Sequence, residues 1–335
     1  MLKKILVSLI ALSLVTGIAQ ALTLNGAGAT FPYPIYSKWF SVYKQEKGVQ
    51  INYSPIGSGG GIRQFMAGVV DFGGTDAYMT DEEMNKVGQP VAHIPTVIGA
   101  VAVVYNAGFE GLKLDGDTLA RIFLGEIKKW NDEKIAELNP GLNLPDKKIL
   151  VVHRSDSSGT TDIFTNYLAK VSTIWAAKVG AGKSVAWPAG VGGKGNPGVT
   201  GAVKNSSGSI GYVELAYAET NNLPTAAIKN RSGRFVAPSV DGTTQAAAGG
   251  LSRIPSDFRG EILNQKGEGA YPISGFTWLV VHKEQKDREK GQALKDFLVW
   301  ALNDGQRYAR ELYYAPMPEQ LKSKILRTVE GITLP

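Results

Sequence analysis

Residues 149–171 are ILVVHRSDSSGTTDIFTNYLAKV, and their pattern indicates the fold class of the chain. It begins with an apolar run, residues 149–152, of the kind found in strands that are covered on both faces. Small and polar residues follow, and residues 160–171 then have a helical pattern. A strand, a loop of small residues and a helix in this order are typical of α/β proteins.

The same alternation extends along the rest of the chain. Apolar patterns predict further strands at residues 49–53, 97–105 and 276–281. Helical patterns occupy residues 33–46, 117–127 and 291–303, with Asp117 as a candidate cap of the second helix. Clusters of Pro and Gly at 182–201 and 237–250 indicate surface loops. The alternation predicts an α/β fold of parallel-sheet units.

Length and composition narrow the class of protein. A chain of 335 residues suggests two domains, and its 40 glycines exceed the usual share, which indicates many tight turns. Cysteine is absent, which excludes disulfides, thiolate metal sites and a lipidated cysteine. The small net charge of +6 is spread along the chain and gives no indication of a nucleic-acid partner.

The first 21 residues have the pattern of an export signal. Lys3 and Lys4 precede an apolar stretch at 5–18, and Ala19-Gln20-Ala21 is a small-x-small cleavage site. The mature chain is therefore expected to begin at Leu22 in the periplasm. No later apolar run reaches the length of a membrane span.

Three loops of small residues precede helix starts: residues 26–32, 57–61 and 154–161. The first turn of a helix carries free backbone N–H groups and the positive end of the helix dipole. Small residues allow an oxyanion to approach, and Ser or Thr hydroxyls add donors. Each loop alone is also compatible with a plain turn, but three in one chain predict an anion site.

Two charged residues refine this prediction. Arg154 offers a planar pair of donors to an oxyanion, and Asp156 is placed to hold the guanidinium, although a surface ion pair is the alternative. Asp76, in VDFGGTDA (70–77), is either a turn residue or an acceptor for a proton on the ligand. Phosphate carries a P–OH near neutral pH and sulfate does not, so a buried carboxylate favours phosphate.

The chain resembles the periplasmic phosphate-binding proteins of ABC-type importers. The likeness covers nearly all of the expected mature chain and rests on six motifs in order: LNGAGATFPYPIYSKWF (24–40), GSGGG (57–61), VDFGGTDA (70–77), LGEIKKWND (124–132), HRSDSSGTTDIFTNYL (153–168) and GSIGYVELAYA (208–218). Ser157 stands where that family commonly has glycine, and residues 237–262 match it poorly.

The resemblance implies an α/β, two-lobed venus-flytrap fold of type II with two inter-lobe crossings. Lobe I would comprise residues 22–95 and 272–335, and lobe II residues 96–271. It also implies inorganic phosphate as ligand, no cofactor or metal, and the membrane permease subunits of an importer as partners. The implied phosphate contacts are Thr30, Phe31, Ser58, Asp76, Arg154, Ser158, Gly159 and Thr160, with Asp156 holding Arg154.

Other functions find less support in the sequence. His93, His153 and His282 lack metal-ligand spacing, and no nucleophile elbow is present, so a phosphate-ester hydrolase is the weaker alternative. Residues 180–184, GAGKS, resemble the end of a Walker loop, but the required earlier glycine is Ala177. Gly26-x-Gly28 fails the dinucleotide fingerprint because Phe31 replaces its last small residue. A receptor for another oxyanion remains the nearest rival.

Overall fold

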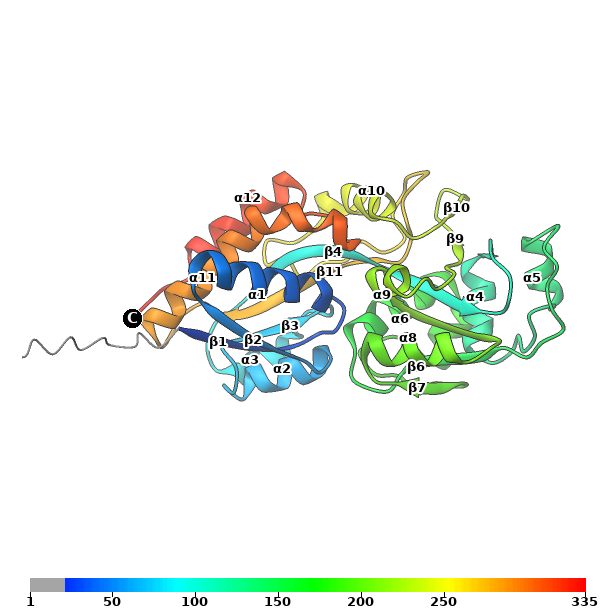
Figure 1. The fold of residues 1–335 in the computed structure, drawn as a ribbon, viewed down its shortest axis with the longest axis horizontal. Coiled ribbons are helices and arrows are strands. Elements are labelled where there is room, and N and C mark those ends of the chain that lie inside the picture. Colours follow the sequence, from blue (N-terminus) through cyan, green and yellow to red (C-terminus); the bar gives the residue numbers. More distant parts are fainter. Residues whose placement is uncertain (1–21) are drawn as a thin grey trace, which may run out of the picture.

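The computed structural model describes residues 22–335, so the expected signal peptide lies outside the described residues. The elements gather in two halves along the long axis of the molecule, and β4 runs from one half into the other (Figure 1). The first part of the chain contains β1 (Thr23–Gly28), α1 (Tyr33–Lys47), β2 (Gln50–Pro55), α2 (Ser58–Met66), β3 (Phe72–Thr75), α3 (Asp81–Val87) and β4 (Val91–Asn106).

The middle and the end of the chain supply the remaining elements. The middle contains β5 (Lys113–Leu114), α4 (Gly116–Phe123), α5 (Glu133–Leu138), β6 (Leu150–Arg154), α6 (Gly159–Val171), α7 (Thr173–Lys178), β7 (Val191–Gly193), α8 (Gly195–Asn205), β8 (Ser209–Glu214), α9 (Leu215–Thr220), β9 (Ala227–Lys229), β10 (Phe235–Val236), α10 (Val240–Gly250) and η1 (Leu251–Arg253). The end contains β11 (Ser274–His282), α11 (Arg288–Leu302), η2 (Asp304–Tyr308), η3 (Arg310–Leu312) and α12 (Glu319–Glu330).

The main sheet is mixed, with strand order β2-β1-β3-β11-β4-β8-β6-β7. Strands β2, β1 and β3 pair in parallel at one end, and β8, β6 and β7 pair in parallel at the other. The central strands β11 and β4 pair antiparallel with each other and with their outer neighbours. The predicted parallel units therefore form the two ends of the sheet, and the prediction missed its antiparallel centre. A smaller sheet has the order β10-β9-β5.

Strand β4 explains how one sheet serves both halves. Residues 91–100 of β4 pair with β11, and residues 101–106 pair with β8. The expected lobe boundary at 95/96 falls inside β4, and the one at 271/272 falls just ahead of β11.

Helix α1 packs on the sheet as its periodicity predicts. Trp39 also donates a hydrogen bond from Nε1 to the Gly305 carbonyl in η2 at 2.8 Å, which ties the start of the chain to its end. Fully burying an aromatic or aliphatic side chain stabilises the fold by about 1.5–3 kcal/mol. The buried face of α1 consists of Ile35, Tyr36, Trp39, Phe40 and Tyr43.

Three local predictions are wrong. Asp115, not Asp117, caps α4 by accepting from the Thr118 N–H at 2.9 Å, because Asp115 is the extended residue just before the helix. Asp117 pairs with Arg121 instead. The Pro/Gly clusters at 182–201 and 237–250 contain α8 and α10 rather than loops alone. In α8 the proline lies in the first turn, where its missing N–H has no cost.

Candidate functional site

The loop between β1 and α1 holds Thr30 and Phe31, and both are buried. Tyr217 donates to the Thr30 carbonyl at 2.6 Å, and Tyr314 donates to the Phe31 carbonyl at 2.6 Å. Because a trans peptide holds its C=O and N–H on opposite sides, the bond from Tyr217 fixes the direction of the Phe31 N–H. Residues from the middle and the end of the chain thus orient this loop.

The second loop places Ser58 at the start of α2. Ser58 is fully buried, and its Oγ accepts from the Asp76 N–H at 3.1 Å. The Gly59 N–H, also in the first turn of α2, donates to the Ser157 carbonyl of the third loop at 3.0 Å. This bond brings the starts of α2 and α6 together, although the two helices are about 100 residues apart in the chain.

The third loop begins with Arg154 at the end of β6. Its guanidinium binds Asp156 through two bonds, Nε to Oδ1 at 2.8 Å and Nη2 to Oδ2 at 2.5 Å. Nη1 donates to Thr160 Oγ1 at 3.2 Å. The Arg154 side chain is 1% exposed, which rules out a surface ion pair.

Asp156 carries its negative charge in spite of its surroundings. Burial acts to raise the pKa of Asp156, but the hydrogen bond and charge of Arg154 and the Gly195 N–H outweigh burial and lower it. The Gly195 N–H lies 2.9 Å from Oδ1. Asp156 therefore neutralises and aligns Arg154 and also ties the start of α8 to the site.

The first residues of α6 complete the third loop. Ser158 caps the helix by accepting from the Thr161 N–H at 3.0 Å, which leaves its hydroxyl hydrogen free to donate elsewhere. Ser158 and Thr160 are fully buried. A Cβ added to Gly159 would lie 2.5 Å from Ser58 Oγ and 2.7 Å from Asp76 Oδ2, so only glycine allows this close approach of α6 to α2 and Asp76.

Asp76 follows β3 and lies close to the start of α6, since a Cβ on Gly159 would be 2.7 Å from its Oδ2. Its Oδ1 accepts from Thr277 Oγ1 at 2.9 Å. Burial is the largest influence on the pKa of Asp76 and raises it to about 7, against the opposing effects of Thr277, Arg154 and Ser58. The carboxylate has thus lost much of its hydration and is favoured to take a hydrogen bond from a protonated partner.

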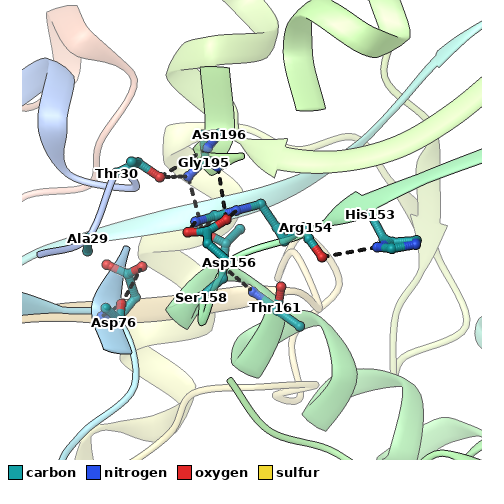
Figure 2. Close-up of polar contacts among 12 residues, drawn as sticks. Ala29, Thr30, Asp76, His153, Arg154, Asp156, Ser158, Thr161, Gly195 and Asn196 are labelled. Atoms are coloured by element: carbon teal, nitrogen blue, oxygen red, sulfur yellow. Dashed lines mark hydrogen bonds and ion pairs between the residues drawn. The ribbon is translucent and has the colours of Figure 1, made fainter. Parts of the chain in front are cut away.

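All of the residues predicted for the site come together at one place between the two halves. Figure 2 shows Thr30 and Asp76 facing Arg154, Asp156 and Ser158, while His153 points away. The His153 ring stacks on Trp187, with centroids 4.8 Å apart, as expected for a residue on the opposite face of the strand. Among residues 22–335 no group of three or more His, Cys, Asp or Glu side chains is arranged to hold a metal ion.

The start of α8 also lies in the site, and the sequence prediction missed it. The Asn196 N–H and side-chain amide both donate to Thr30 Oγ1 at 3.0 Å. The available signal was Gly195-Asn196-Pro197, in which proline after two small or polar residues favours a helix start. The start of α8 was missed because the many Gly and Pro residues at 182–201 were interpreted as a surface loop.

Comparison with known proteins agrees with this geometry. Residues 15–304 match the profile of the PBP superfamily domain. The phosphate-binding protein PstS of Pasteurella multocida is 47% identical over 311 residues, covering 91% of this chain and 89% of the relative. The chain belongs to the PstS family. The PstS protein of Methanocaldococcus jannaschii is 42% identical over 313 residues, with coverage of 86% and 80%.

Solved structures support the fold expected for the PstS family. A periplasmic phosphate-binding protein, PfluDING, bound with phosphate, has a TM-score of 0.72 at 23% identity, covering 91% of this chain and 93% of that chain. At this identity the likeness concerns the two-lobed fold alone. No helix within residues 22–335 has the length and apolar character needed to cross a membrane.

Proposed function

We propose that this chain binds inorganic phosphate between its two lobes and delivers it to an ABC-type importer. The main support for this proposal is that the starts of α1, α2 and α6 and the buried Arg154 lie together with the buried carboxylate of Asp76. Donors surround most of a tetrahedral anion, and Asp76 accepts from its P–OH. The names of the PstS relatives add independent support.

The proposed contacts are those that the family resemblance implies. Thr30, Phe31 and Ser58 donate from one lobe, Arg154, Ser158, Gly159 and Thr160 donate from the other, and Asp156 holds Arg154. The proposed lobes are residues 22–95 with 272–335, and residues 96–271. Closure about the crossings removes water, which strengthens every charged hydrogen bond in the site.

Binding rather than catalysis fits the groups present. Hydrolysis of a phosphate ester needs a positioned nucleophile or metal ion beside the phosphorus. The Ser58 hydroxyl contacts Asp76, but no histidine lies between them to act as a base, and His153 is directed elsewhere. A receptor for a fully deprotonated oxyanion is disfavoured because Asp76 would face an oxygen without a proton.

Equilibrium dialysis of residues 22–335 against labelled phosphate tests the function. Arg154→Ala removes a charged contact from a buried anion and is expected to cost at least about 2 kcal/mol of binding, or about 30-fold in affinity. Arg121→Ala is the matched control, because Arg121 also pairs with carboxylates, those of Asp117 and Glu126, but lies on α4. Equal affinity for Arg154→Ala and the wild type, or turnover of a phosphate monoester, contradicts the proposal.

We also propose that the chain is exported and that it delivers phosphate to the importer. Removal of residues 1–21 would release the chain into the periplasm, where the closed form docks on the permease subunits through the rims of both lobes. Membrane vesicles that contain the importer should take up phosphate faster when the loaded chain is added. No stimulation by the loaded chain contradicts delivery but not binding.

A further inference from the structure

Asn196 occupies the first turn of α8 and is fully buried, and it contacts side chains of both proposed lobes. Its amide nitrogen Nδ2 donates to Thr30 Oγ1 at 3.0 Å and to Thr160 Oγ1 at 3.1 Å. Thr30 precedes α1, and Thr160 lies in α6. One amide group thus joins two hydroxyls, one from each proposed lobe.

The orientation of this amide is fixed by its other end. The Glu214 N–H donates to Asn196 Oδ1 at 2.8 Å. A backbone N–H can only donate, so the atom that faces it must be the amide oxygen. The nitrogen, with its two hydrogens, is therefore directed at the two threonines.

The two hydroxyls are left with a single role. Thr30 Oγ1 accepts from both the backbone N–H and Nδ2 of Asn196. Thr160 Oγ1 accepts from Asn196 Nδ2 and from Arg154 Nη1. A hydroxyl has two acceptor lone pairs and one hydrogen, so each oxygen is saturated as an acceptor and its hydrogen alone remains to bind a ligand.

We propose that Asn196 is a positioning residue that makes Thr30 and Thr160 obligatory donors to the bound anion. The inference rests on the proposed function and deepens it. A free hydroxyl could rotate and accept a hydrogen bond from P–OH, which would compete with Asp76. With both hydroxyls fixed as donors, Asp76 becomes the acceptor for the ligand's proton, and the site selects a protonated tetrahedral anion in one orientation.

A double-mutant cycle in calorimetric phosphate titrations tests the inference. Asn196→Ala is expected to weaken phosphate binding by about 10- to 100-fold, since it removes the restraint on two donors to an anion. In a Thr30→Val/Thr160→Val background the hydroxyls are gone, and the same change should cost less than about threefold. An equal loss in both backgrounds would reveal a purely structural role and overturn the inference.

Thr200→Val provides the matched control. The Thr200 hydroxyl donates to the Asn196 carbonyl at 2.9 Å, so this change touches the same residue without altering the two hydroxyls of the site. Thr200→Val should bind phosphate like the wild type, and Asn196→Ala should retain its full effect in that background. If Thr200→Val loses as much phosphate affinity as Asn196→Ala, the result contradicts the proposal that Asn196 acts through the hydroxyls of Thr30 and Thr160.

Asn196→Asp gives a second measurement that does not require combining Asn196→Ala with Thr30→Val and Thr160→Val. It keeps the shape of the side chain but replaces the donor with an acceptor, toward which both hydroxyls should turn. Its phosphate affinity should fall below that of Asn196→Ala, and equal or tighter binding overturns the inference. Wild-type protein that fails to bind phosphate overturns the proposed function and this inference together, whereas wild-type binding with an unaffected Asn196→Ala overturns the inference alone.

Discussion

At the scale of single residues, Asp76 is the one acceptor among the proposed contacts to the ligand. A carboxylate beside an anion is repulsive unless a proton lies between them. Burial already raises the pKa of Asp76 to about 7, so the carboxyl gains from sharing a proton with its ligand. We propose that the specificity of the site resides in this one hydrogen bond.

Asp76→Asn should therefore weaken phosphate binding more than sulfate binding. The amide can donate to an unprotonated oxygen, so the ratio of the two affinities should narrow by at least about tenfold. Calorimetric titration of the variant with both anions gives the ratio, with Asp117→Asn, a half-exposed change on α4, as the control. A ratio that does not change removes Asp76 from its proposed role.

His93 provides a test of stability that is independent of the ligand. Its Nε2 accepts from the Met79 N–H at 3.0 Å, and burial lowers the pKa of His93 to about 4. A lowered pKa stabilises the fold fully above the unfolded value of about 6.5, and this contribution is lost as the pH falls toward about 4. The raised pKa of Asp76 acts with the opposite sign, so only a comparison of variants isolates His93.

Between pH 7.5 and 5 the wild type should lose about 2 kcal/mol more unfolding free energy than His93→Gln. Glutamine can still accept from the Met79 N–H but does not titrate. Urea unfolding of both proteins at the two pH values measures the difference. Parallel losses would mean that His93 is not held neutral in the folded chain.

The residue types of the site were predictable from the sequence, but their connections were not. Arg154, Asp156 and Ser158 lie in one short motif, so their chemistry is local. Asn196 and Tyr217 reach the site only through tertiary packing. The spacing of residues in the sequence does not predict a long-range hydrogen bond such as that from Tyr217 to the Thr30 carbonyl.

At the scale of elements, the starts of α1, α2 and α6 carry proposed ligand donors, and the start of α8 donates to Asp156 and Thr30. Each follows a strand end directly or after a short loop. The predicted loops were found because small residues beside an apolar strand form a pattern in the sequence. Helix α8 was missed because glycine and proline have low helix propensity, and the burial of Val199 and Val203 on the helix outweighs it.

Gly159→Ala tests the close approach of α6 to α2. Gly159 begins α6 and accepts alanine locally, but the new methyl group would collide with Ser58 and Asp76 when the lobes close. The variant should keep nearly wild-type thermal stability without ligand and bind phosphate at least about 30-fold more weakly.

Gly201→Ala is the matched control for Gly159→Ala. A Cβ at Gly201, in α8, has no heavy atom of another group within 4 Å, so this change should leave binding unaltered. Thermal melts with and without phosphate, together with titrations, compare the two proteins. Wild-type affinity in Gly159→Ala contradicts a closed site between α6 and α2.

At the scale of the whole molecule, an ion pair between side chains that are not proposed ligand contacts joins the proposed lobes. Lys183, after α7, binds both carboxylate oxygens of Glu83 in α3 at 2.8 and 3.1 Å. Both side chains are only partly exposed. An ion pair that forms only on closure adds to the apparent affinity for any ligand that requires closure.

Lys183→Met should weaken phosphate binding by about two- to fivefold, in keeping with a partly buried ion pair. Glu83 is unsuitable for substitution because its carboxylate also caps α3. Lys178→Met is the control, since Lys178 pairs with Glu126 within one proposed lobe. The difference in phosphate affinity between Lys183→Met and the wild type should become smaller in 1 M salt. A loss of affinity that does not depend on salt contradicts an ionic origin.

The mixed sheet marks the limit of prediction at this scale. Apolar runs located β4, β6 and β11, but the direction of a strand leaves no trace in its hydrophobicity. The antiparallel pairing of β4 with β11 and β8 depends on how distant segments meet. The family resemblance, rather than periodicity, therefore predicted the two-lobed arrangement.

Calorimetric titration of residues 22–335 with phosphate, arsenate and sulfate under one set of conditions tests whether the site recognises a proton on its ligand. Phosphate should bind more tightly than sulfate, and an affinity near 1 μM would correspond to a free energy of about −8 kcal/mol. Arsenate, also tetrahedral and protonated, should compete with it, and sulfate should bind at least about 10³-fold more weakly. Sulfate binding as tight as that of phosphate would contradict recognition of the ligand's proton by Asp76.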